Sequence, residues 1–161
     1  MADYQILPMT REQAEKILTW KYQPPYGVYD LDGEDLYELL NPDYRYHQVL
    51  NPEGELVGYC CYGIDAQVPG GDYSCGEPQV LDIGVGLRPD LTGQGQGRSF
   101  VSAVLHYAWK VYRPEVFRVS VADFNQRSLN TFRNLGFEIT HHFMRELGQL
   151  PFTQLERKAY E

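Results

Sequence analysis

Glycine is concentrated between Val80 and Phe100, where it alternates with glutamine as Gly93-Gln-Gly-Gln-Gly97. A strand pattern ends just before this run, and a helix pattern begins within it. The free N–H groups and the dipole at a helix N-terminus attract anions, and glycines let the backbone approach a ligand without a Cβ in the way. The spacing therefore favours a phosphate site, although glycines alone are also compatible with an ordinary tight turn.

Two familiar phosphate-binding loops are excluded by this segment. A Walker loop needs a Gly-Lys pair before Ser or Thr, and the sequence contains no such pair. The dinucleotide fingerprint Gly-x-Gly-x-x-Gly also fails, because its last position is Arg98 when counted from Gly93 and Phe100 when counted from Gly95. The phosphate site would therefore be of another kind.

A second block, from Val119 to Phe137, places an Asn before a helix pattern and Gly-Phe at its end. Together the two blocks resemble motifs A and B of the GNAT superfamily of N-acetyltransferases. Motif A reads Gln/Arg-x-x-Gly-x-Gly/Ala, and motif B opens a helix with Asn and closes on Tyr-x-x-x-Gly-Phe. The residues at these positions here are Thr92, Gly95, Gly97, Asn125, Phe132, Gly136 and Phe137. The resemblance covers most of the chain, because the order of strands and helices fits as well.

The resemblance implies that the cofactor is acetyl-CoA. The loop from Thr92 and Gly93 onward would hold the diphosphate through the backbone N–H groups of Gln94, Gly95, Gln96, Gly97 and Arg98. The strand backbone at Val85 and Leu87 would pair with the pantetheine arm, and Phe132 would line the same site. Asn125 would contact the arm or stabilise an opening between strands, and it is equally suited to cap the following helix. Of four arginines that could meet phosphates (Arg88, Arg98, Arg127 and Arg133), we favour Arg98.

The chain departs from the family pattern at three positions. Thr92 replaces the usual Gln or Arg, so one long polar side chain near the phosphates is missing. Phe132 stands where many members carry a tyrosine that protonates the departing thiolate, and phenylalanine has no proton to give. Ser120 stands where some relatives place a glutamate base. Another group or water would then serve as the acid, or protonation of the leaving group is unimportant here.

For the base that accepts the amine proton we consider the strand before the glycines. Alternation places Asp82, Gly84 and Gly86 on one face of this strand, and the two glycines leave a slot for close approach to the backbone. Asp82 heads that row and is our candidate base, alternatively a structural carboxylate. Glu77, on the preceding loop, is a weaker candidate.

An aromatic cluster follows the first helix and comprises Trp20, Tyr22, Tyr26 and Tyr29. The fold implied by the resemblance places this segment beside the acceptor pocket. The residues up to Leu87 carry 15 acids and four bases, whereas the rest carries seven acids and ten bases. Aromatic rings near acids favour a cationic amine, and a basic second half suits a phosphate-rich cofactor. Packing of the rings in a core is the alternative.

The elements that would position these residues follow the order β-α-α-β-β-β-α-β-α-β-β. This is an α/β (α+β) fold, a mixed and mostly antiparallel sheet of about six to seven strands flanked by helices, in a single GNAT-type domain over residues 1–161. Strands are expected at 4–7, 46–50, 55–63, 79–87, 117–121, 137–143 and 152–158. Helices are expected at 11–20, 34–40, 97–112 and 125–135, and a loop at 64–78.

Composition excludes several classes of protein. The net charge of −8 argues against a nucleic-acid surface, which needs a basic stripe. No apolar run approaches the roughly 20 residues of a membrane span, and the N-terminus does not resemble a signal peptide, so we expect a cytoplasmic protein. Cys60, Cys61 and Cys75 are expected to be free thiols, largely buried. His47, His106, His141 and His142 lack the spacing of metal ligands and are expected on the surface, with no metal site.

The sequence thus predicts an N-acetyltransferase that moves an acetyl group from acetyl-CoA to a primary amine by direct attack. The amine would belong to a small molecule or to a protein N-terminus, and the enzyme could form a homodimer. Because Phe132 and Ser120 leave two catalytic positions empty, a non-catalytic acyl-CoA-binding module of the same fold is the alternative.

Overall fold

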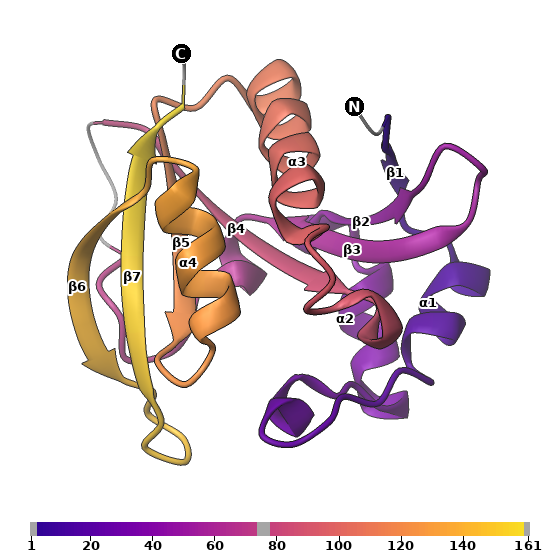
Figure 1. Cartoon of the computed structure of the whole chain (residues 1–161), viewed down its shortest axis with the longest axis horizontal. Coiled ribbons are helices and arrows are strands. Elements are labelled where there is room, and N and C mark those ends of the chain that lie inside the picture. The colour runs from indigo at the N-terminus through magenta and orange to yellow at the C-terminus, as the bar shows by residue number, and fades with distance from the viewer. Residues whose placement is uncertain (1–2, 74–77, 160–161) are drawn as a thin grey trace.

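The computed structural model describes residues 3–73 and 78–159 and consists of a seven-stranded sheet with helices on both faces (Figure 1). The strands are β1 (Gln5–Pro8), β2 (Tyr46–Leu50), β3 (Leu56–Tyr62), β4 (Val80–Leu87), β5 (Val116–Ala122), β6 (Glu138–Met144) and β7 (Pro151–Lys158), and the helices are α1 (Arg11–Ile17), α2 (Leu36–Leu40), α3 (Gly97–Tyr112) and α4 (Gln126–Asn134). Their order across the sheet is β1-β2-β3-β4-β5-β7-β6. The predicted fold class and element order are confirmed.

The sheet opens in its middle. All neighbouring strands pair antiparallel except β4 and β5, which are parallel and paired only from Val80–Asp82 to Val116–Arg118. Beyond that point β4 stays with β3 as far as Leu87, and β5 stays with β7 as far as Ala122. The two strands therefore diverge, and Figure 1 shows them spread apart with α4 in front of β5.

Alternation along the strands builds one core on each face of the sheet. Phe100 and Val104 of α3 pack with Cys60 of β3 and with Phe132 of α4 in the larger core. A Cβ at Gly58 would lie 2.5 Å from the Phe100 ring, so glycine there lets α3 approach the sheet. On the opposite face, α1 and α2 form a smaller core around Ile17 and Leu39.

Three predicted boundaries differ from the structure for local reasons. The first helix ends at Ile17 rather than Trp20, because Thr19 and Trp20 donate to carbonyls three residues back and tighten the last turn. The acidic helix expected at 34–40 is divided into a 3₁₀ turn, Gly33–Asp35, and α2. The loop expected at 64–78 contains a short 3₁₀ turn, Ile64–Ala66, and its residues 74–77 lie outside the described residues.

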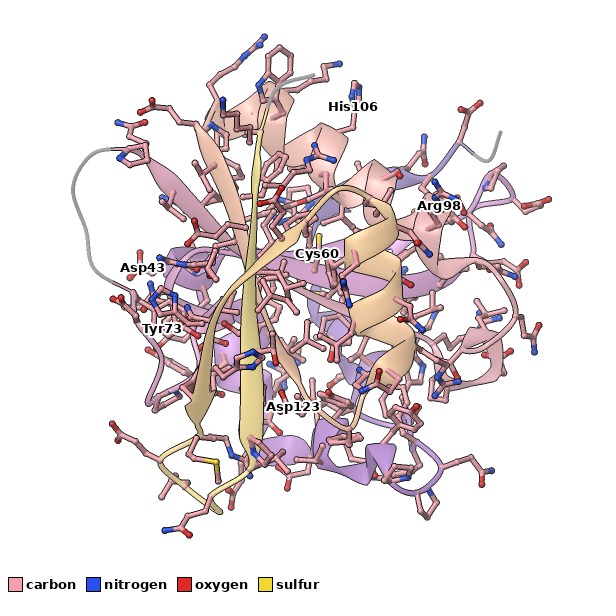
Figure 2. All side chains as sticks on the ribbon, turned by 60° about the vertical axis from the view of Figure 1, so that its left-hand side comes forward. Asp43, Cys60, Tyr73, Arg98, His106 and Asp123 are labelled. Atoms are coloured by element: carbon pink, nitrogen blue, oxygen red, sulfur yellow. The ribbon has the colours of Figure 1, made fainter. Side chains whose placement is uncertain are left out.

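The cysteines behave as predicted where the structure describes them. Cys60 and Cys61 are free and buried, and Cys60 lies near the centre of the molecule in Figure 2. Burial raises the pKa of the Cys60 thiol to about 12, so this group stays protonated at neutral pH. Cys75 and Glu77 lie outside the described residues.

The expectation of surface histidines is wrong for His47, which is only 7% exposed. Its ring packs edge-on against Tyr62 and Tyr107. Nδ1 lies 2.8 Å from the Arg45 carbonyl oxygen, and Nε2 lies 3.1 Å from the Tyr107 hydroxyl. The alternation of side chains along β2 points His47 into the core. Its two ring nitrogens are both hydrogen-bonded there, which lowers the cost of burying them.

We predict that His47 makes the protein less stable in mild acid. Burial lowers the pKa of His47, so the unfolded state, with a pKa near 6.5, binds a proton that the folded state does not. The loss of stability caused by His47 is absent well above pH 6.5. It grows as the pH falls, by up to about 1.4 kcal/mol per pH unit. Urea unfolding at pH 7.5 and 5.5 should show a smaller loss of stability in His47→Gln than in the wild type. The exposed His106→Gln is the control, and equal losses in all three proteins would contradict the prediction.

Candidate functional site

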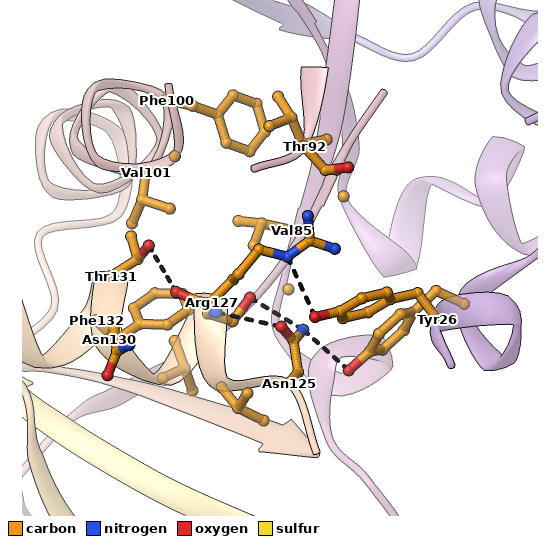
Figure 3. Close-up of a pocket in the computed structure, with 18 of the residues that line it drawn as sticks. Tyr26, Val85, Thr92, Phe100, Val101, Asn125, Arg127, Asn130, Thr131 and Phe132 are labelled. Carbon is orange, nitrogen blue, oxygen red and sulfur yellow. Dashed lines mark hydrogen bonds between the residues drawn. The ribbon is translucent and has the colours of Figure 1, made fainter. Parts of the chain in front are cut away.

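The opening between β4 and β5 leads into a cleft of about 570 Å³. One wall is β4 and the other is β5 with α4. The glycine loop and the first turn of α3 lie at one side, and residues of the aromatic segment lie at the other. Figure 3 shows Val85, Asn125, Arg127 and Phe132 gathered around this space. The cleft therefore contains parts of both sequence blocks.

One backbone edge of β4 faces the opening. Gly63 donates to the carbonyl of Asp82, and Arg88 donates to the carbonyl of Val57, so the even-numbered residues of β4 bond to β3. In an antiparallel pair the alternate residues point their N–H and C=O groups the other way. Ile83 directly follows Asp82, the last residue that pairs with β5, so its N–H is used in that ladder. Val85 and Leu87 present their N–H and C=O groups to the cleft, where an extended chain could pair with them as an added strand.

The free edge at Leu87 is partly used by the protein itself. The Tyr22 hydroxyl donates a hydrogen bond of 2.7 Å to the Leu87 carbonyl oxygen. Burial raises the pKa of Tyr22, with the nearby Asp30 as a second cause, so this phenol remains a donor. A ligand would thus find Val85 with both groups accessible and Leu87 with its N–H.

The glycine loop presents a row of backbone N–H groups. Within the described residues, the N–H groups of residues 93–99 have no hydrogen-bond acceptor. Gly93 and Gly95 have φ angles of +73° and +82°, which glycine adopts without strain, and α3 begins at Gly97 without a side-chain cap. Such a row at a helix N-terminus suits a diphosphate.

The loop is folded back by its own side chains. Thr92 donates to the Pro89 carbonyl at 2.8 Å, and the Gln94 amide donates to the Asp90 carbonyl at 2.8 Å. Thr92 lines the cleft, whereas the side chains of Gln94 and Gln96 do not. Neither glutamine is among the residues that line the cleft, so the binding of phosphate by their N–H groups stays a prediction.

Helix α4 faces this loop with polar side chains. Arg127 lies close to Gly93, where a Cβ would be 2.7 Å from its Nη1, and Thr131 lies against Gly97. The Arg127 Nε donates to the Tyr26 hydroxyl at 3.2 Å, and its guanidinium lies 4.2 Å from the centre of that ring (Figure 3). Arg98 and Arg127 are the charged side chains in the described lining. The cleft is therefore electropositive beside the glycine loop.

The other two candidate arginines have different surroundings. Arg88 pairs with Asp90 at 2.7 Å and donates to the Leu56 carbonyl, and neither Arg88 nor Arg133 lines the cleft. Arg98, the arginine that the sequence favoured, lines the cleft, and Arg127 lines it as well. Its position on the first turn of α4 was the available signal.

Asn125 caps α4 and also lines the cleft, so it is placed for both of the roles predicted for it. Its Oδ1 caps α4 by accepting from the Ser128 N–H at 3.2 Å. Its Nδ2 donates to the Tyr29 hydroxyl at 3.2 Å, and the residue lines the cleft. Asn125 therefore connects α4 to the aromatic segment across the opening.

The aromatic segment is divided between the cleft and the smaller core. Tyr22, Tyr26 and Tyr29 line the cleft, and the last two also contact Phe124. Trp20 does not line it, because its indole packs on Tyr59 and into the core beneath α1 and α2. Tyr59, on β3, takes a place in the lining that no pattern in the sequence indicated.

The structure places Asp82 away from this cleft. Its carboxylate receives Arg118 Nε at 2.6 Å and Nη2 at 2.9 Å, and also the Gln67 amide at 3.0 Å. Both charged side chains are 7% exposed, beside a separate hollow of about 460 Å³. Three donors already engage this carboxylate, so we do not assign it the role of a base.

The slot expected beside the glycines of β4 is filled by the protein. A Cβ at Gly86 would collide with the Tyr59 ring, and one at Gly84 would lie 2.9 Å from the Cys61 sulfur. Phe132 lines the cleft but is 3% exposed, with its ring edge-on to Phe137. Position 132 therefore offers a hydrophobic wall and no proton donor.

The described part of the chain lacks two further features. Residues 3–73 and 78–159 contain no group of three or more His, Cys, Asp or Glu arranged to hold a metal ion. In the same ranges, no helix has the length and apolar character needed to cross a membrane.

Solved structures share this fold over nearly their whole length. A spermidine N-acetyltransferase chimera from Vibrio cholerae and hSSAT superposes with a TM-score of 0.71 at 16% identity, covering 97% of this chain and 95% of that one. An acetyltransferase of the GNAT family from Bacillus anthracis gives 0.69 at 15% identity, with 100% and 98% covered. A dodecameric spermidine N-acetyltransferase from Vibrio cholerae gives 0.69 at 15% identity, with 97% and 94% covered.

Comparison of the sequence itself identifies the family. No curated protein sequence matched the chain. The family model described as acetyltransferase (GNAT) family matches residues 11–137, which include the aromatic segment, the glycine loop and α4. The chain therefore belongs to the GNAT family of acetyltransferases.

Proposed function

We propose that this enzyme transfers the acetyl group of acetyl-CoA to a primary amine. The observation that carries the proposal is that the glycine loop, through Gly93, Gly95, Gly97 and Arg98, and the open edge of β4 line the same cleft. Coenzyme A has a diphosphate at one end of an extended amide-containing arm, so it needs both features together. Arg98 and Arg127 supply positive charge beside the N–H row.

The β4 edge can also act on the reacting carbonyl. Bound acetyl-CoA supplies an activated thioester carbonyl for attack by a neutral amine. The N–H group of Val85 points into the opening and is suited to stabilise negative charge on the carbonyl oxygen. Asn125 and Tyr22 hold the two sides of the cleft in position around the arm.

The acceptor side is aromatic rather than acidic. Tyr22, Tyr29 and Tyr59 present rings there, and the charged groups of the described lining are the two arginines. The acidic surplus of the first half of the chain therefore does not reach the described cleft wall. We expect a monoamine with an apolar or aromatic body to be a better acceptor than spermidine, the polyamine for which two of the similar structures are named.

Cofactor binding is tested by thermal unfolding. Acetyl-CoA at about 100 times its dissociation constant should stabilise the protein by about 2.7 kcal/mol. For a chain of this size that corresponds to a rise in Tm of about 5–10 °C. ATP and NAD serve as controls for nonspecific phosphate binding, and no shift with acetyl-CoA would contradict the assignment of the cleft.

Turnover is tested by release of free CoA thiol over a panel of amines that includes phenethylamine, spermidine and a peptide N-terminus. The background from Cys60 and Cys61 should be low, because both are buried. We expect thiol release that depends on the amine, with a higher kcat/KM for phenethylamine than for spermidine. Binding of acetyl-CoA without acceptor-dependent release over the whole panel would favour a non-catalytic acyl-CoA-binding module instead.

A further inference from the structure

Two hydroxyl groups meet at the narrow end of the cleft. Ser120 lies on β5, two residues beyond the last residue that pairs with β4, and it lines the cleft. Its Oγ is 2.6 Å from the hydroxyl of Tyr73, which belongs to the segment between β3 and β4. The cleft thus ends at a serine that is backed by a phenol.

Tyr73 is held in place from several sides. Its hydroxyl accepts a hydrogen bond of 2.9 Å from the Val68 N–H, and its ring packs over Gly71. The neighbouring Asp72 backbone is bound through both its N–H and its C=O by the fully buried amide of Gln154 on β7. These contacts fix the phenol oxygen beside Ser120.

A cation lies next to the same phenol. The Arg118 guanidinium is 4.9 Å from the centre of the Tyr73 ring, and Asp82 holds that guanidinium through two hydrogen bonds. The Arg118 cation and the Val68 N–H therefore both face this phenol. Asp82 therefore serves the cleft indirectly, by fixing Arg118.

Three of the seven other hydroxyl groups in the described lining donate to backbone carbonyls. Tyr22 donates to Leu87, Thr92 donates to Pro89, and Thr131 donates to Arg127. Position 132 has no hydroxyl at all. With the phosphates at the glycine loop, the arm of coenzyme A would run toward the narrow end, where Ser120 lies.

We propose that Ser120 and Tyr73 form a two-hydroxyl relay that protonates the leaving sulfur, an inference that rests on the proposed function. As the C–N bond forms, the C–S bond breaks and its electron pair goes to sulfur. Ser120 gives its proton to the sulfur and takes the proton of Tyr73. The tyrosinate recovers, through solvent, the proton that the attacking amine loses. Ser120 is then a catalytic residue, and Tyr73 acts through it as a positioning residue and proton source.

The kinetic test uses Ser120→Ala, Tyr73→Phe and Ser120→Thr. A general acid contributes about 10²-fold or more to kcat. The kcat of Ser120→Ala should therefore fall by at least that factor, with little change in the KM for acetyl-CoA. Tyr73→Phe should lower kcat in the same direction with an unchanged KM. Ser120→Thr keeps the hydroxyl and should retain most of the activity. Ser102→Ala and Tyr112→Phe, on α3 and outside the cleft lining, are the matched controls.

A binding test does not depend on turnover. Titration calorimetry compares CoA with desulfo-CoA, which lacks the sulfur. A single hydrogen bond to sulfur is worth about a fivefold difference in affinity. Ser120→Ala should therefore bind CoA about fivefold more weakly than the wild type but bind desulfo-CoA equally well, and Tyr73→Phe should show a smaller effect of the same kind.

The outcomes separate the relay from the proposed function. Failure of the wild type to bind CoA overturns both. Wild-type turnover with both variants within threefold in kcat, and with an unchanged ratio of CoA to desulfo-CoA affinity, overturns the relay and leaves the acetyltransferase proposal standing. If one variant fails to fold, the other carries both measurements.

Discussion

Replacing Gly95 with alanine is expected to weaken acetyl-CoA binding about tenfold while changing the fold little. Gly95 has a φ of +82°, and a Cβ at this position would have nothing within 4 Å. Alanine therefore meets no neighbour but disfavours the left-handed backbone by about 1–2 kcal/mol. The loop would relax in the free protein, and binding would have to restore it, which costs about tenfold in affinity. At a ligand concentration that stabilises the wild type by about 2.7 kcal/mol, the variant should gain only about 1.4 kcal/mol.

The chain offers a matched control for this change. Gly54, in the hairpin turn between β2 and β3, has a φ of +83° and also has nothing within 4 Å of a Cβ. Gly54→Ala should lower the stability of the free protein by about 1–2 kcal/mol, the cost of a left-handed alanine. It should leave the stabilisation by acetyl-CoA unchanged. Equal loss of this stabilisation in both variants would mean that the glycine loop holds no ligand through its backbone.

Replacing Asp82 with alanine is expected to destabilise the protein by about 3–5 kcal/mol. The change leaves the Arg118 guanidinium buried without its carboxylate, which is far more costly than losing an exposed pair. For a chain of this length the Tm should fall by about 6–20 °C. Thermal and urea unfolding of the purified variant measure the effect.

Two further variants show whether the cost comes from the buried charge. Asp90→Ala removes the partner of Arg88. The Asp90 side chain is 64% exposed, so this change should cost less than about 1 kcal/mol. The double variant Asp82→Leu, Arg118→Met removes both charges and should recover most of the lost stability. If Asp82→Ala lowers the stability no more than Asp90→Ala does, Asp82 does not hold Arg118 in the way described for the cleft.

Features set by local sequence could be predicted. The tight glycine turn, the start of α3 at Gly97 and the Asn125 cap depend on residues only a few positions apart, and the structure has all of them. The alternation that places Ile83, Val85 and Leu87 on one face of β4 is also local, and the larger core contains these side chains. The cofactor side of the cleft followed from such signals.

The other side of the cleft could be predicted only in part, through Tyr22, Tyr26 and Tyr29, because distant pairings create the rest. Asp82 meets Arg118 because β4 and β5 pair in parallel, and Ser120 meets Tyr73 across 47 positions of sequence. Neither contact produces a periodic pattern in the sequence from which it could have been predicted. Trp20 and Tyr22 belong to one aromatic run, yet they face different surroundings because the segment is irregular and has no alternation to separate them.

The central claim is that the opened edge of β4 and the N–H row of the glycine loop together hold acetyl-CoA. A crystal structure of the protein soaked with acetyl-CoA tests this most directly. We predict density for the diphosphate against the N–H groups of residues 93–99 and for the arm between β4 and β5. Density for the ligand elsewhere, such as the hollow beside Arg118 and Tyr112, with an empty opening between the strands, would contradict it.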